Sequence, residues 1–126
     1  MAKNPTHNTS KTHIADLVYV LEKLGVHRLM ISPGSRSAPL VIALERSEGI
    51  ECMTITDERC AAFFALGVAL ARGEAVGMVC TSGSAPLNYS PALAEAFYQQ
   101  VPLIALTADR PNEWIDQGEN QSINQT

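Results

Sequence analysis

The chain has 126 residues, 46 % of them hydrophobic, which is enough for one domain with a sizeable core. Its formal net charge of −4 excludes a broadly basic surface that would recruit nucleic acid. No apolar run approaches the roughly 20 residues of a membrane-spanning helix. The polar first ten residues also lack the apolar run of a signal peptide. We therefore expect a cytoplasmic protein with no membrane span.

The cysteines and histidines give no sign of a metal site. The three cysteines are odd in number, fall in apolar segments and form no CxxC pair, so we expect reduced, buried thiols. The histidines are scattered near turns and the N-terminus, where we expect them to be solvated. These residues are Cys52, Cys60, Cys80, His7, His13 and His27.

Short apolar runs alternate with helical patterns along the chain. Residues 1–11 are polar and are expected to form a disordered tail, and residues 12–126 form one domain. Thr12 and Asp57 are predicted helix N-caps. Helices are predicted over 12–24, 38–46, 58–72 and 87–98, and strands over 28–32, 51–56, 76–81 and 103–107.

This alternation predicts an α/β fold, a doubly wound and mainly parallel sheet with helices on both faces. The last residues, 120–126, are polar and contain no closing helix or strand. We therefore expect the domain to be incomplete at its C-terminus.

The predicted helix 58–72 is apolar on nearly every side from Ala61 to Ala71. One sheet face cannot cover such a helix, so a second subunit is expected to cover the rest, with Gly67 allowing close approach. Glu58, at the mouth of this helix, would lie at the subunit boundary, where a carboxylate needs a partner or a proton. It is our candidate catalytic acid. The alternative is an ordinary acidic residue that the helix dipole favours.

Polar loops follow all four predicted strands and should meet at one edge of the sheet, where α/β proteins bind ligands. Ser35 and Arg36 precede a helix, an arrangement that favours an anion. Arg110 follows the fourth strand. Two arginines at one edge favour a carboxylate or phosphate ligand. The alternatives are a surface arginine at 36 and a salt bridge from Arg110 to Asp109 or Glu113.

A third loop, Ser82-Gly83-Ser84, is either a plain turn or a backbone cradle against a ring. Asn88, just beyond it, could reach the same ring or be an exposed polar residue of a first helical turn.

Taken in order, these motifs resemble the 2-succinyl-5-enolpyruvyl-6-hydroxy-3-cyclohexene-1-carboxylate synthases, thiamine diphosphate enzymes of menaquinone biosynthesis. The resemblance covers residues 12–125 and matches only the N-terminal, pyrimidine-binding domain of that family. It rests on Ser32-Pro33-Gly34-Ser35-Arg36-Ser37, Asp57-Glu58-Arg59 with the following apolar helix, Thr81-Ser82-Gly83-Ser84-Ala85, Thr107-Ala108-Asp109-Arg110-Pro111 and Asn120-Gln121.

The resemblance implies thiamine diphosphate as cofactor, with Glu58 bonded to its pyrimidine ring and Ser82, Gly83, Ser84 and Asn88 nearby. It also implies that Ser35, Arg36, Arg110 and Gln121 contact isochorismate, to which decarboxylated 2-oxoglutarate is added. Glu119 departs from the family pattern, and it places a negative charge near a site that the resemblance assigns to anions.

Mg²⁺ or Mn²⁺ would be bound by a C-terminal domain that this chain does not contain, and the chain itself has no metal ligands. These enzymes bind their cofactor between subunits, which agrees with self-association through helix 58–72. The chain alone is expected to be inactive. Two alternatives stay open: a non-catalytic α/β carboxylate-binding module, and another thiamine diphosphate decarboxylase or carboligase such as an acetolactate synthase.

Overall fold

The computed structural model describes residues 11–115, 117–121 and 123–125. A four-stranded sheet in the order β2-β1-β3-β4 forms its centre, and every neighbouring pair of strands is parallel. The strands are β1 (Arg28–Ile31), β2 (Glu51–Thr54), β3 (Val76–Cys80) and β4 (Leu103–Thr107). The helices are α1 (Thr12–Lys23), α2 (Ala38–Glu45), α3 (Glu58–Arg72), α4 (Ser84–Leu87), α5 (Ser90–Gln99) and the 3-10 turn η1 (Asn112–Trp114). The expectation for residues 1–10 lies outside the described residues.

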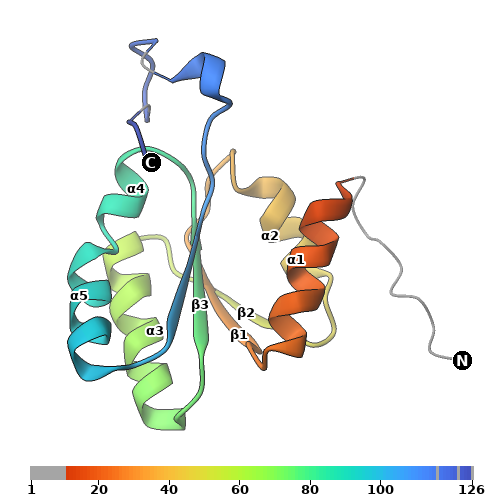
Figure 1. Cartoon of the computed structure of the whole chain (residues 1–126), viewed down its shortest axis with the longest axis vertical. Coiled ribbons are helices and arrows are strands. Elements are labelled where there is room, and N and C mark those ends of the chain that lie inside the picture. The colour runs from red at the N-terminus through yellow and green to blue at the C-terminus, as the bar shows by residue number, and fades with distance from the viewer. Residues whose placement is uncertain (1–10, 116, 122, 126) are drawn as a thin grey trace, which may run out of the picture.

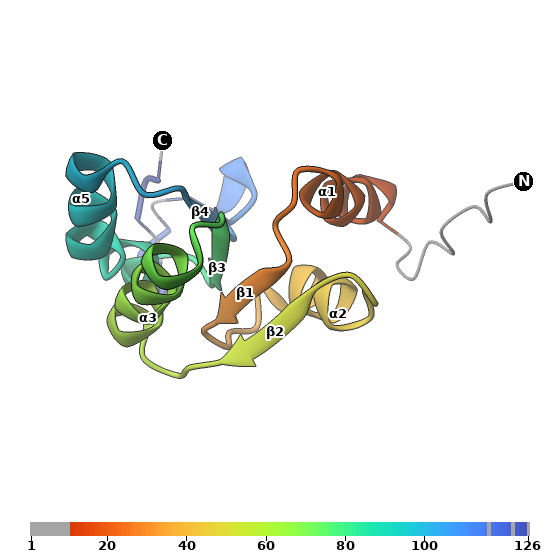
Figure 2. The same cartoon turned by 90° about the horizontal axis from the view of Figure 1, so that it is seen from below.

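Helices cover both faces of the sheet, as the alternating pattern predicts. Figure 2 shows α1 and α2 on one side of the strands and α3 and α5 on the other. Each side has its own core. One contains Val18, Leu21, Val26, Leu29, Ile31, Ala43, Leu44, Ile50 and Val79, and the other Met30, Ala61, Ala62, Ala65, Ala69, Val76, Met78, Cys80, Ala85, Tyr89 and Ala92. The predicted α/β fold is confirmed.

The helix α3 begins and ends where the sequence predicts. The Asp57 carboxylate accepts a hydrogen bond of 2.8 Å from the backbone N–H of Cys60, which makes Asp57 the N-cap. Gly73 ends the helix with φ of 67°. The residues that α3 turns to the core are mostly alanines, so the helix can approach the sheet closely.

Three expectations about local structure are wrong. Lys11, not Thr12, is the N-cap residue of α1, and no side chain caps that helix. The single helix predicted over 87–98 spans two helices, because Leu87 ends the short α4 and α5 begins at Ser90, with Pro91 in its first turn. Cys60 is an exposed thiol, since it faces outward from the first turn of α3.

Candidate functional site at the carboxyl edge of the sheet

From β1 the chain adds β2 on one side and then β3 and β4 on the other side. The order of the strands therefore switches between β1 and β3, and ligands of open α/β sheets bind at such a switch point. The two loops that follow these strands touch there. A Cβ atom on Gly34 would lie 2.4 Å from the Cβ atom of Thr81, so only glycine permits this approach. The backbone N–H of Ser32 also donates to the Val79 carbonyl at 2.8 Å.

The segment after β4 folds back over these loops, at the top of Figure 1. The Gly83 N–H donates to the Gln125 side-chain oxygen at 2.9 Å, and the Gln125 amide donates to the Ala108 carbonyl at 3.1 Å. The Ser82 hydroxyl donates to the Gln121 carbonyl at 3.3 Å. The loops after β3 and β4 are therefore joined through Gln121 and Gln125.

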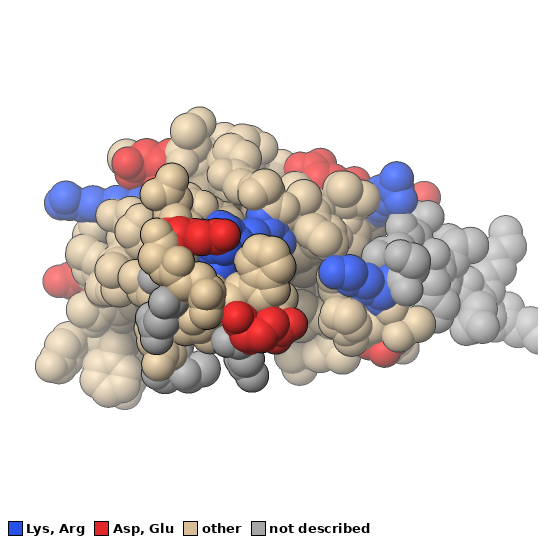
Figure 3. All heavy atoms as spheres, turned by 90° about the horizontal axis from the view of Figure 1, so that it is seen from above, with Lys and Arg blue, Asp and Glu red and all other residues tan. Residues whose placement is uncertain are grey.

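All four predicted substrate-binding residues line one pocket. This pocket, of about 470 Å³, is open to solvent and is lined by Ser35, Arg36, Arg110, Gly118, Glu119, Asn120 and Gln121. We call it the arginine pocket. Arg36 donates to the Gln121 side-chain oxygen at 3.1 Å, which joins residues 85 positions apart in sequence. Viewed from above, Figure 3 shows Lys and Arg atoms in the middle of this face with Asp and Glu atoms beside them.

Arg110 is the more deeply placed of the two arginines. Its side chain is only 7 % exposed. The guanidinium forms an ion pair with Glu119 and donates a hydrogen bond to the Asn120 carbonyl, while its Nε–H is buried without a partner among the described residues. The alternative predicted a salt bridge from Arg110 to Asp109 or Glu113, but the partner is Glu119. The Asp109 carboxylate instead accepts from the backbone N–H of Arg110 at 2.7 Å.

Gln121 is held in a strained conformation beside this pocket. Its φ of 58° lies in the left-handed region, which costs a residue other than glycine about 1–2 kcal/mol. The backbone of Gly83 packs so closely against Gln121 that a Cβ atom there would lie 2.4 Å from the Gln121 Cα atom. The contacts with Gly83, Ser82 and Arg36 together fix this conformation, as is typical of backbone strain at functional sites.

Glu58 lies apart from the arginine pocket, in the first turn of α3. Its side chain is half-buried, and it forms no salt bridge within the described part of the chain. The neighbouring Asp57 is exposed, and the pKa of its carboxyl is lowered, chiefly by the hydrogen bond from the Cys60 N–H. Asp57 therefore caps the helix, which leaves Glu58 with free acceptor capacity at the sheet edge.

A buried group that sequence reasoning missed lies near Glu58. Tyr89 is fully buried, and its hydroxyl has no hydrogen-bond partner in the described structure, although Ser32 and Cys80 lie beside it. Burial raises the pKa of Tyr89 above its ordinary value, and burial also raises the pKa of Cys80 to about 11. The Glu58 charge contributes to both shifts, so the three side chains share one electrostatic environment. The sequence offers no signal for this, because a tyrosine among apolar residues is typical of a core.

The other predicted cofactor residues lie in and just after the loop that follows β3. Ser82 and Gly83 are buried and contact Gln121 and Gln125, whereas Ser84 is exposed and begins α4. Asn88 is exposed after α4, and its amide donates to the Ser84 carbonyl at 3.4 Å. Neither Ser84 nor Asn88 lines the arginine pocket.

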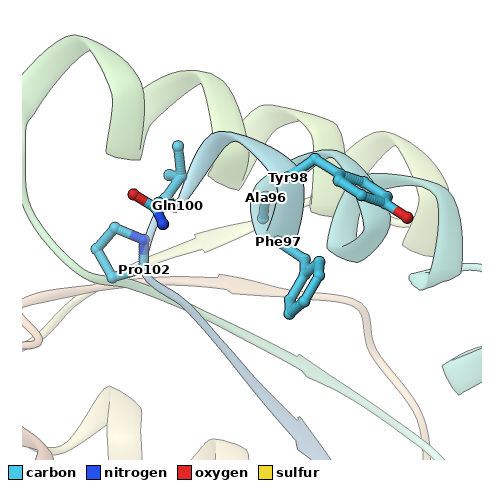
Figure 4. Close-up of a pocket in the computed structure, with 6 residues that line it drawn as sticks. Ala96, Phe97, Tyr98, Gln100 and Pro102 are labelled. Carbon is cyan, nitrogen blue, oxygen red and sulfur yellow. The ribbon is translucent and has the colours of Figure 1, made fainter.

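A second hollow, of about 560 Å³, lies at the end of α5 and contains no predicted site residue. Figure 4 shows Gln100 and Pro102 on one side of it and Phe97 on the other. Within the described residues, no group of three or more His, Cys, Asp or Glu side chains could hold a metal ion. Nor does any helix in that part of the chain have the length and apolar character needed to cross a membrane.

The fold and this edge define a parallel α/β domain whose polar loops gather at the switch point of the sheet. A family model described as "Thiamine pyrophosphate enzyme, N-terminal TPP binding domain" matches residues 12–126, and the chain belongs to this family. Thiamine diphosphate is thus the cofactor of the family, as the motifs indicate.

Relatives with more specific names are also similar to this chain. Proteins named 2-succinyl-5-enolpyruvyl-6-hydroxy-3-cyclohexene-1-carboxylate synthase are 56 % identical over 117 residues in Porphyromonas gingivalis and 51 % identical over 113 residues in Geobacillus kaustophilus. The alignments cover 93 % and 90 % of this chain. They cover 20 % of each relative, so the chain spans about a fifth of the length of these proteins. The resemblance inferred from the motifs is confirmed.

Proposed function

We propose that this chain is the N-terminal, pyrimidine-binding part of a synthase that decarboxylates 2-oxoglutarate and adds the product to isochorismate. The name carried by the relatives from Porphyromonas gingivalis and Geobacillus kaustophilus supports this proposal. One observation carries the proposal: the same edge of the sheet has a carboxylate at the N-terminus of a helix and, at a separate place, a pocket with two guanidinium groups.

The residues around Glu58 fit the pyrimidine ring of thiamine diphosphate. Glu58 has free acceptor capacity and lies near the buried, uncharged side chains of Cys80 and Tyr89. A carboxylate in such surroundings can hold a hydrogen bond to a ring nitrogen without competition from a cation. In this proposal Glu58 holds that bond, and Ser82, Gly83, Ser84 and Asn88 border the ring. The cofactor, when bound, supplies the electron sink for decarboxylation and carbon–carbon bond formation.

The arginine pocket fits the second substrate. Isochorismate carries two carboxylates, and guanidinium groups form paired hydrogen bonds to carboxylates. Arg36 and Arg110 would bind these groups, and Ser35 and Gln121 would orient the ring. The separation of Glu58 from this pocket agrees with a reaction in which one site activates the donor and the other holds the acceptor.

Two further parts of the proposal concern the rest of the protein. Mg²⁺ or Mn²⁺ would be held by a C-terminal domain, in the part of the relatives that this chain does not span. The subunits would associate through α3, whose outer face is apolar, and the protein would act in the cytoplasm.

An assay of the full-length protein with 2-oxoglutarate, isochorismate, Mg²⁺ and thiamine diphosphate tests this function. We expect product formation that depends on both substrates and on the cofactor. Residues 1–126 alone should be inactive. If 2-oxoglutarate is consumed with pyruvate or an aldehyde as the preferred acceptor, the protein is a different carboligase. Carboxylate binding with no turnover would favour a non-catalytic binding module.

A further inference from the structure

The arginine pocket already holds a carboxylate from its own chain. Arg110 forms an ion pair with Glu119, nine residues further along the same loop. The two partners are unequally placed, because the Arg110 side chain is 7 % exposed and the Glu119 side chain 50 %. Arg36, the other guanidinium of the pocket, is bonded to the neutral amide of Gln121.

We infer that Glu119 occupies the place of a ligand carboxylate on Arg110 and is displaced when an anionic ligand binds. Glu119 would thereby set the affinity and charge preference of the pocket. This inference rests on the proposed function, since it takes the arginine pocket as the binding place of a carboxylate substrate.

The difference in burial indicates which partner can leave. A buried guanidinium without an anion is strongly unfavourable, and the Arg110 Nε–H is already buried without a partner in the described structure. Glu119 is half exposed, so water can solvate its carboxylate once it leaves. Arg110 therefore requires an anion, whereas Glu119 does not require Arg110.

The backbone around Glu119 allows this exchange. Gly118 has φ of 72° and open space around its Cα atom, so it leaves room on one side. On the other side Gln121 is fixed by Arg36, Ser82 and the close packing of Gly83. In this inference the Glu119 side chain turns outward, while the Asn120 carbonyl stays on Arg110 and Gln121 keeps its contacts with Ser82 and Arg36.

This arrangement favours ligands with two acidic groups. One carboxylate must replace Glu119 on Arg110, and a second can pair with Arg36, where it displaces only a neutral amide. A neutral ligand of the same shape cannot compensate for the lost ion pair. If Glu119 occupies Arg110 nine-tenths of the time, the apparent affinity for a ligand falls about tenfold.

The test is calorimetric titration of the full-length protein with isochorismate alone, so that no turnover occurs. Wild type, Glu119→Gln, Arg110→Ala and the double variant are compared. Glu48→Gln is the matched control, because Glu48 is exposed in the loop before β2, at the opposite edge of the sheet, and its replacement changes the net charge equally. We expect Glu119→Gln to bind about three- to tenfold more tightly and Glu48→Gln to bind like wild type. The gain should vanish in the Arg110→Ala background.

The outcomes separate this inference from the proposed function. If Arg110→Ala weakens binding but Glu119→Gln leaves it unchanged or weaker, the inference is overturned and the proposed function stands. If Arg110→Ala binds isochorismate like wild type, both are overturned. Glu119→Asp is a conservative variant that guards against a folding defect. Its carboxylate is on a shorter side chain, so this variant should bind isochorismate with an affinity between those of wild type and Glu119→Gln.

Discussion

Gly83 and Gln121 pack so closely that a Cβ atom on residue 83 would lie 2.4 Å from the Gln121 Cα atom. The contact joins the loop after β3 to the segment after β4. It gives Gly83 a role that the sequence did not indicate, because only a residue without a side chain leaves room for the backbone of Gln121. Access to the pyrimidine ring, which the motif suggested, is a separate proposal.

Gly83→Ala should displace Gln121 and weaken isochorismate binding in the full-length protein. The new methyl group cannot fit, and φ of 81° is itself unfavourable for alanine. Gly73→Ala is the control for a positive φ without a steric clash, because Gly73 has φ of 67° and ψ of 31° in the left-handed helical region, with open space around it. The φ of 81° and ψ of −128° at Gly83 are less favourable still for alanine. The control should lose about 1–2 kcal/mol of stability and bind isochorismate with unchanged affinity. Gly83→Ala should lose more stability than the control and should also bind isochorismate more weakly. Calorimetry and chemical denaturation measure the two effects, and equal affinities of the two variants would contradict this role for Gly83.

Glu58→Gln should slow cofactor activation by orders of magnitude with little effect on folding. The amide can still hydrogen-bond a ring nitrogen, but it cannot share a proton with it. Exchange of the cofactor C2 proton, followed by NMR in the full-length protein, measures this step directly. Glu48→Gln, an exposed position outside the site, serves as control. Near-normal exchange in Glu58→Gln would remove Glu58 from its proposed role.

Arg36→Ala and Arg110→Ala should each impair the use of isochorismate more than the use of 2-oxoglutarate. Loss of a charge-assisted hydrogen bond costs about 1.5–3 kcal/mol, roughly a ten- to hundredfold change in affinity. Because Arg110 is also buried against Glu119 and Asn120, its replacement should lower thermal stability more than that of Arg36. Steady-state kinetics with each substrate varied in turn gives the comparison. Equal effects on the two substrates would mean that the arginines are structural.

The sequence predicts the fold well because the residues that begin and end its helices and strands act locally. Gly73 ends α3, Asp57 caps it, and the apolar run 103–107 coincides with β4. The same rules fail at the N-terminus of α1, where Thr12 is already helical and Lys11 precedes it. They also fail at 87–98, where one periodic pattern crosses from the end of α4 at Leu87 into α5, which begins at Ser90. A capping side chain is favoured at a helix N-terminus but is not required there, and an apolar pattern does not show where one helix ends and the next begins.

The candidate site could be predicted only in part. Topology alone brings Ser35, Arg36, Arg110 and Gln121 to one edge, which is why these four line one pocket. The partner of Arg110 could not be predicted, because a loop has no periodicity that would pair it with Glu119 rather than Glu113. Tyr89 was missed for a different reason, since its hydroxyl lies near Cys80 and Glu58 only through the packing of α5 against α3.

The Asp57 cap should give stability that depends on pH. The pKa of Asp57 is lower in the folded protein than its ordinary value of 3.8, so the ionised carboxylate stabilises the fold. This contribution is complete above about pH 4 and is lost as the pH falls through the lower, folded pKa. Asp57→Asn keeps a capping group that does not titrate. The stability difference between wild type and Asp57→Asn, measured by denaturation across this range, should therefore shrink at acid pH. Asp16→Asn on α1, exposed and outside a cap, controls for the charge change.

The outer face of α3 should mediate self-association of the full-length protein. Exposed residues recur at helical spacing along it: Cys60, Phe63, Phe64, Gly67, Leu70 and Ala71. Phe63, Phe64 and Leu70 are 40 %, 45 % and 52 % exposed, an apolar stripe that soluble monomers avoid. Leu66, which the apolar pattern alone would place at such an interface, is 6 % exposed. Leu66→Glu would therefore unfold the domain rather than test its assembly.

Phe64→Glu and Leu70→Glu are the informative variants, because both residues are exposed in the single chain. Covering the exposed half of one such side chain is worth about 1 kcal/mol, and a glutamate buried there adds the cost of desolvating a charge, so either substitution should shift the protein toward monomer. Val20→Glu is the control, since Val20 is 47 % exposed on α1, on the other face of the sheet. Sedimentation velocity at several concentrations measures the assembly, and thiamine diphosphate binding should fall with it if the cofactor lies between subunits. If both α3 variants sediment like wild type while Val20→Glu does not, the subunits meet through the α1 face instead.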